Sequence, residues 1–177
     1  DIEIRNNVVM YLAIKWAKDN NKKSIITGDG ADELFAGYNF LVNKPEKELE
    51  SEIKRVCSIM HFPTQEIGKH LGIKIESPFL NQKIVEIANQ IPVNLKVKEE
   101  NGTRYGKWIL RKTIEKYIPE QIVWRKKSPM QEGAGTVGLT NLFESIINEE
   151  KYVEKKLTIE KNDQVIIRSR ESMYYYE

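Results

Sequence analysis

The stretch Ser24–Tyr38, SIITGDGADELFAGY, decides the fold class. Residues 23–27 are short and rich in β-branched side chains, which predicts a strand, and the closing ADELFAGY predicts a short helix. Before the strand, residues 5–18 predict an amphipathic helix whose apolar face is Val8, Val9, Leu12, Ala13 and Trp16. The order helix, strand, glycine-rich loop, helix is typical of a doubly wound α/β unit, in which ligands bind beyond the carboxyl ends of strands.

The rest of the chain predicts mostly helices. We expect them over 46–61, 65–71, 82–90, 105–117, 139–148 and 164–176, with an extended piece at 73–76 and a glycine-rich loop at 128–138. Thr64 and Asn81 are the expected caps of two of these helices. In the helix over 82–90 the expected inward-facing residues are Ile84, Val85, Ile87 and Ala88. The predicted class is therefore α/β, mostly helical, with an α/β core over 1–45 and a helical extension over 46–177.

One strand and a second short candidate are too few for a parallel sheet, whose strands are normally buried on both faces. The chain also begins at Asp1 rather than Met. We therefore expect it to be part of a longer domain whose other strands precede Asp1.

Composition bounds the function only loosely. The 177 residues include 28 Lys and Arg against 26 Asp and Glu, a net charge of +2, which gives no argument for nucleic acid or membrane partners. Cys57 is the single cysteine, so no internal disulfide can form. With no signal peptide or long apolar run, we expect a cytoplasmic protein. Asn101-Gly102 predicts a polar turn rather than a glycosylation site.

The loop after the predicted strand concentrates negative charge. Asp29, Asp32 and Glu33 lie close together beside Gly28 and Gly30. Carboxylates at such a place need compensation by a cation, and glycines let the backbone turn close to a ligand, so the loop suits a Mg²⁺-nucleotide site. An Asx turn that caps the next helix explains the same residues, and the loop alone leaves both interpretations open.

A basic segment lies further along the chain. Arg125, Lys126 and Lys127 precede Gly133 and Gly135. Three more cations lie on the helix predicted before it: Lys107, Arg111 and Lys112. A lysine before a glycine-rich loop can neutralise a phosphate or a leaving pyrophosphate, whereas the alternative is a solvated basic surface. The presence of an acidic loop and a basic loop in one chain favours the binding site.

Three segments resemble motifs of asparagine synthetases and related amide-forming synthetases. SIITGDGADELFAGY resembles S-G-(D/E)-G-x-D-E-(L/V)-F-x-G-Y, with Thr27 where serine is usual. GIKIESPFLNQKIVEIANQIP resembles the G-x-E-x-R-x-P-F-L-D segment and its following helix. KWILRKTIEKYIPEQIVWRKKSPMQEGAG resembles the K-x-x-L-R, P-x-x-I and R-x-K-x-x-x-x-x-G-x-G series. The three stand in the family's order and span residues 24–135.

The resemblance implies an ATP-pyrophosphatase-type fold, similar to adenine-nucleotide α-hydrolases, with a parallel sheet and a helical C-terminal extension. It also implies a two-step reaction in which Mg-ATP adenylates a carboxylate and ammonia then displaces AMP. In asparagine synthetases that carboxylate is the side chain of aspartate. The ammonia is free or comes from glutamine through a glutaminase domain or subunit, and a homodimer is a further expectation.

Roles carry over by position. Asp32 matches the Mg²⁺-coordinating aspartate, and Lys127 matches the lysine that contacts the phosphates and stabilises the departing pyrophosphate. Asp29 stands where these enzymes often have glutamate and is the expected general base for the amine. The other implied nucleotide-binding positions are Gly28, Gly30, Arg125, Gly133 and Gly135. For Arg111 and Arg125, phosphate contact and structural pairing both remain open.

The chain also departs from the family pattern. It lacks the pyrophosphate-binding S-G-G-x-D-S loop, expected before Asp1, and the glutaminase cysteine, which Cys57 does not replace. Lys74 and Glu76 stand where the family commonly has glutamate and arginine, an exchange that preserves a salt bridge or changes substrate contacts. Two alternatives stay open: a sister synthetase with another carboxylate, such as a lactam-forming enzyme, and a non-catalytic nucleotide-binding module. We expect residues 1–177 alone not to turn over.

Overall fold

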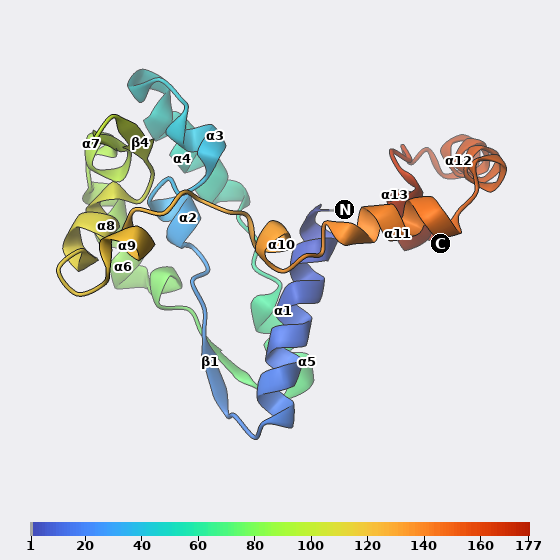
Figure 1. Cartoon of the computed structure of the whole chain (residues 1–177), viewed down its shortest axis with the longest axis horizontal. Helices are drawn as coiled ribbons and strands as arrows, with labels where there is room; N and C mark the ends of the chain where they lie inside the picture. The colour runs from blue at the N-terminus through green and yellow to red at the C-terminus, as the bar shows by residue number, and fades with distance from the viewer. Residues whose placement is uncertain (1) are drawn as a thin grey trace. The chain divides into compact units, whose positions relative to one another are not determined.

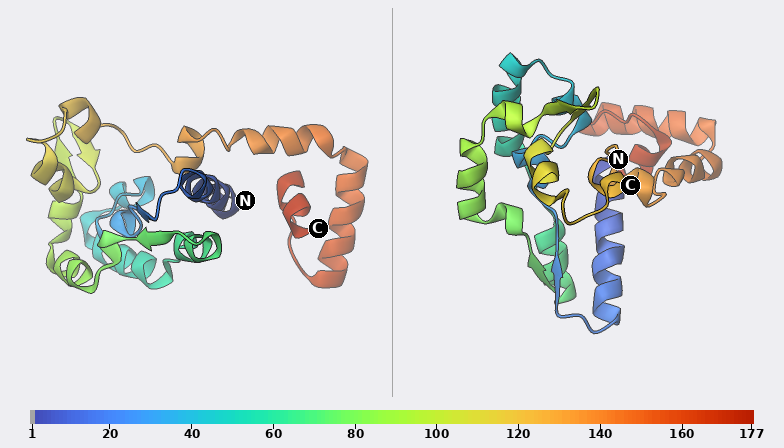
Figure 2. Two further views of the ribbon diagram at one scale, coloured as in Figure 1. Left: turned by 90° about the horizontal axis from the view of Figure 1, so that it is seen from below. Right: turned by 60° about the vertical axis from the view of Figure 1, so that its left-hand side comes forward.

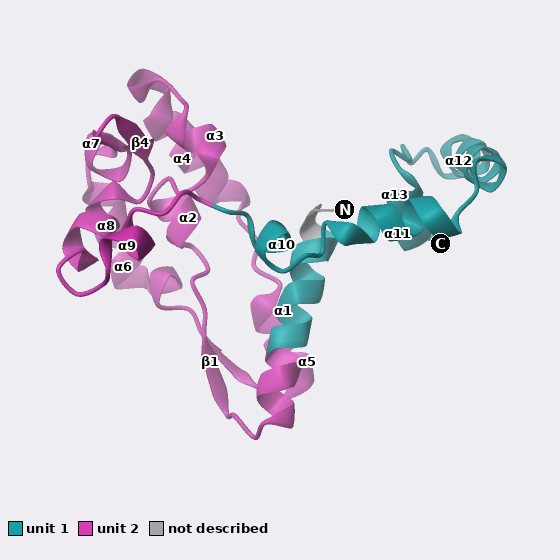
Figure 3. Ribbon diagram, viewed as in Figure 1, with its two compact units in different colours: residues 1–13, 128–177 teal, residues 14–127 magenta. Residues whose placement is uncertain are grey.

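The computed structural model describes residues 2–177. Most of them are helical, and the described strands form two small sheets (Figure 1). Two compact units are present: residues up to Ala13 with Ser128–Glu177, and Ile14–Lys127 (Figure 3). The first helix, α1 (Ile2–Asp19), contributes residues to both. The expected class, α/β and mostly helical, is confirmed.

The strand predicted over 23–27 and the extended piece predicted over 73–76 are both present. β1 (Ser24–Ile26) pairs in parallel with β2 (Lys74–Glu76), with Ile25 opposite Ile75. Ile14 of α1 packs in one core cluster with Leu71 and Ile73, at the end of α5 (Thr64–Leu71). This small sheet brings the ends of β1 and β2 together.

The expected apolar face of α1 is wrong. Ile14 and Ala17 are the buried residues, whereas Leu12 and Trp16 are 55% and 64% exposed. Periodicity identifies a helix, but which stripe is buried depends on where a partner lies, and in the described structure the partner of α1 packs on the Ile14 side.

The middle of Ile14–Lys127 is a group of short helices around two core clusters. Its elements are α2 (Ala31–Leu34), α3 (Asn39–Val42), α4 (Glu46–Ile59), η1 (Pro78–Leu80), α6 (Gln82–Gln90), α7 (Val93–Lys96), α8 (Trp108–Ile114) and α9 (Glu120–Val123). Leu41, Leu49 and Ile53 centre one cluster, and Leu34 and Phe35 belong to the other. These clusters fix the segment that follows β1.

Local signals succeeded for one helix cap and failed for the other. Asn81 caps α6, because its side chain accepts a hydrogen bond from the Lys83 amide at 3.0 Å. Thr64 is instead buried in the first turn of α5, and Pro63 occupies the cap. In α6, Ala88 is buried but Ile87 is 55% exposed, so the expected inward face is only partly right.

A hairpin interrupts the helix expected over 105–117. β3 (Lys98–Glu100) pairs antiparallel with β4 (Thr103–Tyr105), and α8 begins only at Trp108. The turn is the predicted Asn101-Gly102, whose φ angles of 50° and 75° suit a tight hairpin.

The other unit ends in three helices. α13 (Arg170–Tyr176) packs against both α11 (Gly138–Ile146) and α12 (Glu149–Asp163) (Figure 2). The shared core comprises Phe143, Ile147, Ile159, Ile167 and Met173. The helix expected over 164–176 begins only at Arg170, and α12 was not predicted. The loop expected over 128–138 contains a short helix, α10 (Met130–Gly133).

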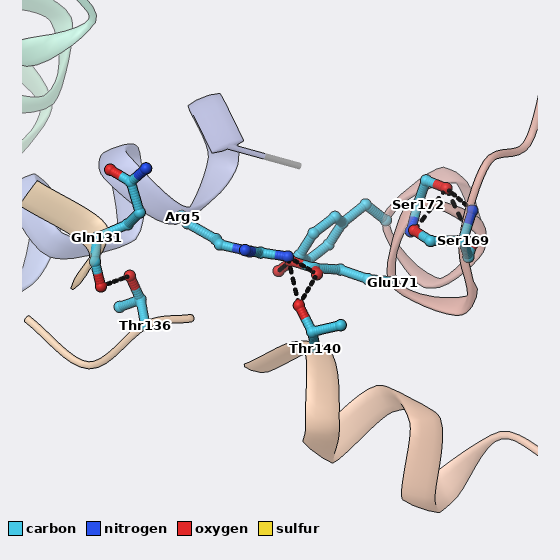
Figure 4. Close-up of polar contacts among 8 residues, drawn as sticks. Arg5, Gln131, Thr136, Thr140, Ser169, Glu171 and Ser172 are labelled. Atoms are coloured by element: carbon cyan, nitrogen blue, oxygen red, sulfur yellow. Dashed lines mark hydrogen bonds and ion pairs between the residues drawn. The ribbon is translucent and has the colours of Figure 1, made fainter. Parts of the chain in front are cut away.

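An ion pair joins the first and last helices of this unit. Arg5 donates to the buried Glu171 carboxylate from Nε at 2.8 Å and also from Nη2 (Figure 4). Thr140 of α11 donates to the same carboxylate at 3.0 Å, and Tyr175 donates at 3.0 Å. Hydrogen bonding by Arg5 lowers the pKa of Glu171, so the pair stays charged within the unit. Among residues 2–177, no helix is long and apolar enough to span a membrane.

Candidate functional site

The acidic loop begins where β1 ends. The Thr27 hydroxyl donates to Asp29 Oδ2 at 2.9 Å and lies 2.9 Å from the hydroxyl of Ser77, the residue after β2. Gly30 has a φ of 90°, and a Cβ there would lie 2.6 Å from Leu80. The parallel strand pair and a required glycine therefore position Asp29 at the carboxyl end of the sheet.

Asp32 is the point where the acidic and basic segments meet. Lys127 Nζ lies 3.0 Å from each carboxylate oxygen of Asp32. Lys107 Nζ lies 3.0 Å from Oδ2 of the same group. All three side chains are partly buried, so the charges interact with less screening than they would at an open surface. The structure thus joins two predicted site residues from positions 95 apart in the sequence.

Glycine makes this approach possible. A Cβ at Gly37 would lie 2.0 Å from Asp32 Oδ1 and 2.3 Å from Lys107 Cε. A Cβ at Gly106 would lie 2.0 Å from the Ala36 carbonyl oxygen. Side chains at either position would therefore separate the acidic loop from the start of α8.

Tyr38 lies beside Lys127. Its hydroxyl donates to the buried Glu33 carboxylate, and its ring centroid lies 5.8 Å from Lys127 Nζ. Burial, with the Glu33 charge, raises the pKa of Tyr38 far above its ordinary value, so the phenol stays protonated as a donor. Glu33 is therefore a supporting residue beneath the site rather than an exposed ligand.

Arg111 and Arg125 have different surroundings. Arg111 donates to three backbone carbonyls, those of Gly106 at 2.9 Å, Arg125 at 3.2 Å and Val123. Its guanidinium therefore fixes the segment that leads to Lys127. The Arg125 side chain is exposed, and its phosphate contact stays a prediction.

Other predicted positions are placed as follows. Gly28 is exposed, with open space where a Cβ would be. Gly133 and Gly135 lie in the other compact unit, so their part in this site stays a prediction. Lys74 and Glu76 do form a salt bridge, at 2.9 Å. Cys57 is half-buried on α4, and burial raises its pKa, as expected for an unreactive thiol.

Sequence reasoning assigned no role to Lys107. It adopts a left-handed conformation, φ 54°, at the cap of α8, and its amide donates to the Phe35 carbonyl at 2.9 Å. A lysine at the start of a motif that resembles K-x-x-L-R was the available signal, but its meeting with Asp32 depends on the tertiary fold.

The donor set fits a magnesium ion with partial protein ligation. Mg²⁺ commonly binds through one or two carboxylates and completes its shell with water and phosphate oxygens, and Asp32 supplies one such carboxylate. Among the described residues, no group of three or more His, Cys, Asp or Glu side chains is arranged to hold a metal by itself. Lys107 and Lys127 supply positive charge for an anionic partner beside it.

The chain matches a known protein family over most of its length. A family model described as asparagine synthase matches residues 2–71 and 66–171. The chain therefore belongs to the asparagine synthase family, and the resemblance seen in its motifs is confirmed.

Individual relatives agree. The chain is 30% identical over 159 residues to a probable asparagine synthetase (glutamine-hydrolyzing) of Dictyostelium discoideum, a match that covers 82% of this chain and 28% of the relative. It is 31% identical over 146 residues to asparagine synthetase B (glutamine-hydrolyzing) of Escherichia coli K12, covering 80% and 26%. It is 28% identical over 169 residues to asparagine synthetase (glutamine-hydrolyzing) 1 of Saccharomyces cerevisiae, covering 86% and 30%. The chain thus spans less than a third of the length of these relatives.

Proposed function

We propose that this chain is part of an ATP-dependent ligase that makes asparagine. In the proposed reaction, the side-chain carboxylate of aspartate attacks the α-phosphate of ATP, which releases pyrophosphate and leaves an acyl-AMP. Ammonia then attacks the acyl carbon, and AMP departs with the bond electrons. The observation that carries the proposal is the 3.0 Å contact between Asp32 and Lys127. The carboxylate suits the metal ion of a metal–phosphate substrate, and the ammonium group suits its phosphate.

Each residue then has a defined task. Asp32 would hold Mg²⁺, which neutralises polyphosphate charge when bound. Lys127 and Lys107 bind phosphate oxygens, and the Lys127 charge stabilises the leaving pyrophosphate as negative charge develops on it. Asp29, oriented by the Thr27 hydroxyl, accepts the proton that the attacking amine loses. Gly28 and Gly30 keep the backbone close to the ligand, and Arg125, Gly133 and Gly135 stay proposed nucleotide-binding positions on the strength of the motif resemblance.

The proposal extends to the whole protein. Residues 1–45 would belong to an ATP-pyrophosphatase-type parallel sheet and 46–177 to its helical extension. The names of the relatives, which specify glutamine hydrolysis, support ammonia supplied by a glutaminase domain or subunit. A cytoplasmic homodimer remains part of the proposal.

The test is aspartate-dependent ATP–pyrophosphate exchange with the intact protein, beside a Lys127→Ala variant and a panel of other carboxylates. We expect exchange with aspartate that falls by at least about 100-fold in the variant, because a transition-state charge contact is lost. Lys69→Gln, an exposed cation of α5, is the matched control. Exchange only with another acid would assign a sister synthetase, and no exchange with any acid would contradict the proposal.

A further inference from the structure

A series of side-chain hydrogen bonds leads from the exposed surface of α5 to Asp29. The Gln65 amide donates to the Ser77 hydroxyl at 3.1 Å. The Ser77 and Thr27 hydroxyls lie 2.9 Å apart, and Thr27 donates to Asp29 Oδ2 at 2.9 Å. These four residues, the Asp29 network, all belong to Ile14–Lys127 and so lie within one compact unit.

The register of the parallel strands brings the two hydroxyls together. Ile26 of β1 lies opposite Glu76 of β2, and the Thr27 amide donates to the Glu76 carbonyl at 2.8 Å. The next residues along the two strands, Thr27 and Ser77, are therefore neighbours at the carboxyl end of the pair. A shift of one residue in this register would turn one hydroxyl to the opposite face of the sheet.

A glycine brings α5 close enough for Gln65 to take part. A Cβ at Gly68 would lie 2.8 Å from the Ile73 carbonyl oxygen and would also meet Ile75 of β2. Gln65 precedes Gly68 by three residues, so both lie on the same face of α5. The close packing that Gly68 permits therefore holds the Gln65 amide beside Ser77, the residue that follows β2.

The chemistry of the groups fixes the direction of each bond. An ionised carboxylate only accepts, so the single hydroxyl proton of Thr27 goes to Asp29. The Thr27 oxygen must then accept from Ser77, whose own oxygen accepts from the Gln65 amide. Every donor in the network therefore points towards Asp29 Oδ2.

Asp29 and Asp32 have different partners although they share one loop. Asp32 contacts the ammonium groups of Lys107 and Lys127. Within residues 2–177, Asp29 makes no ion pair and its Oδ1 accepts no hydrogen bond. Neutral donors orient a carboxylate without cancelling its charge, so Asp29 keeps one oxygen able to take up a proton.

We propose that Ser77 and Gln65 are positioning residues for Asp29, which direct Oδ1 of its carboxylate to the attacking ammonia. The hydrogen bond from Ser77 holds Thr27 in the one rotamer that reaches Asp29. As the nitrogen bonds to the acyl carbon, an N–H bond breaks, its electron pair stays on nitrogen and the proton passes to Oδ1. The inference rests on the proposed function, in which Asp29 is the general base, and adds two residues to which that function gives no task.

The first test observes the Asp29 network without any activity. Three-bond couplings to the Thr27 methyl carbon report its rotamer by NMR in the intact protein. We expect one rotamer in the wild type and in Ser77→Thr, which keeps a hydroxyl, and averaging over at least two in Ser77→Ala. Gln65→Glu should average as well, because a carboxylate accepts the Ser77 proton and takes it from Thr27. One fixed Thr27 rotamer in both Ser77→Ala and Gln65→Glu would overturn the proposal.

A second test separates positioning from stability. Ser77→Ala should lower ammonia-dependent asparagine formation about tenfold, the effect of one lost hydrogen bond, and leave aspartate-dependent ATP–pyrophosphate exchange within about twofold of wild type. Exchange reports the step before ammonia attacks, so it does not need Asp29 as a base. Ser51→Ala, which removes an exposed hydroxyl of α4, is the matched control and should change neither rate.

Combination with Asp29→Asn decides whether Ser77 acts through Asp29. In that background, Ser77→Ala should cause no further loss of asparagine formation, because the group that it positions is already gone. Equal losses of exchange and asparagine formation in Ser77→Ala, or full additivity of the two substitutions, would overturn the positioning role. Absence of exchange with any acid in the wild type would contradict the proposed function instead, and the Thr27 couplings would then decide the network by themselves.

Discussion

Replacing Gly37 with alanine should disable the Asp32 site without unfolding the protein. The new Cβ would lie 2.0 Å from Asp32 Oδ1 and 2.3 Å from Lys107 Cε, whereas ordinary contact begins near 3.4 Å. The carboxylate oxygen must therefore withdraw by about 1.4 Å, because Gly37 itself is buried. Its partners cannot all follow, since Lys127 is also held over the Tyr38 ring.

The size of the effect follows from that displacement. Lys127 Nζ is 3.0 Å from both Asp32 oxygens, so a withdrawal of Oδ1 from it by more than 1 Å breaks that bond and disrupts the two-oxygen contact. Misplacing a catalytic group by about 1 Å commonly costs about 100-fold in rate, or about 2.7 kcal/mol of transition-state stabilisation. We therefore expect Gly37→Ala to lower kcat/KM for aspartate-dependent exchange by about 100-fold.

The assay compares exchange rate with thermal unfolding for the same preparations. Gly138→Ala is the matched control, because a Cβ there meets open space and the backbone has no positive φ. It should leave both quantities nearly unchanged. A Gly37→Ala protein that melts normally and exchanges at the wild-type rate would refute the placement of Asp32 and Lys107 around Gly37.

Three further outcomes concern stability. Tyr38→Phe should lower the free energy of unfolding by about 1–3 kcal/mol in urea titrations, because Glu33 stays buried without its donor, whereas Glu33→Gln, which keeps an acceptor oxygen, should cost less; equal losses would count against the contact. Asn81→Ala should cost about 1 kcal/mol through the lost cap of α6, and Asn81→Asp should restore most of it. Hydrogen bonding by Arg5 lowers the pKa of Glu171 below its ordinary value of 4.5. The stabilisation that the ion pair gives is therefore complete above about pH 4.5 and is lost as the pH falls through the lowered folded-state pKa. Glu171→Gln should flatten that part of the acid-unfolding profile, and an unchanged profile would contradict the pair.

Short-range signals in the sequence predicted well where the cause was local. Asn81 caps a helix through its own neighbours, and Asn101-Gly102 forms a turn through its own backbone freedom. The β-branched run at Ser24–Ile26 formed a strand for the same kind of reason. The presence of an acidic loop and a basic segment in one chain pointed to a common site, and the structure joins them through Asp32 and Lys127.

The predictions failed where contacts between distant parts of the chain determine which residues are buried and which backbone conformation they adopt. Most residues of α12 are charged or polar and only Ile159 is buried, so its sequence lacks a clear apolar stripe. Trp16 looked internal because its spacing is helical, yet the packing partner lies on the Ile14 side. Lys107 has a left-handed backbone and donates its amide to the Phe35 carbonyl, a contact between distant positions that no local pattern indicates.

The bond between Arg5 and Glu171 also bears on how the chain is made. These residues are 166 positions apart, so during synthesis on the ribosome Arg5 lacks this partner until the segment through Glu171 has emerged. Residues Ile14–Lys127 are contiguous, and they can form their contacts first. Their folding fixes the ends of the long intervening segment, which reduces the entropy that later closure must overcome. The contacts between the residues up to Ala13 and Ser128–Glu177 therefore form after Ile14–Lys127 has been synthesised.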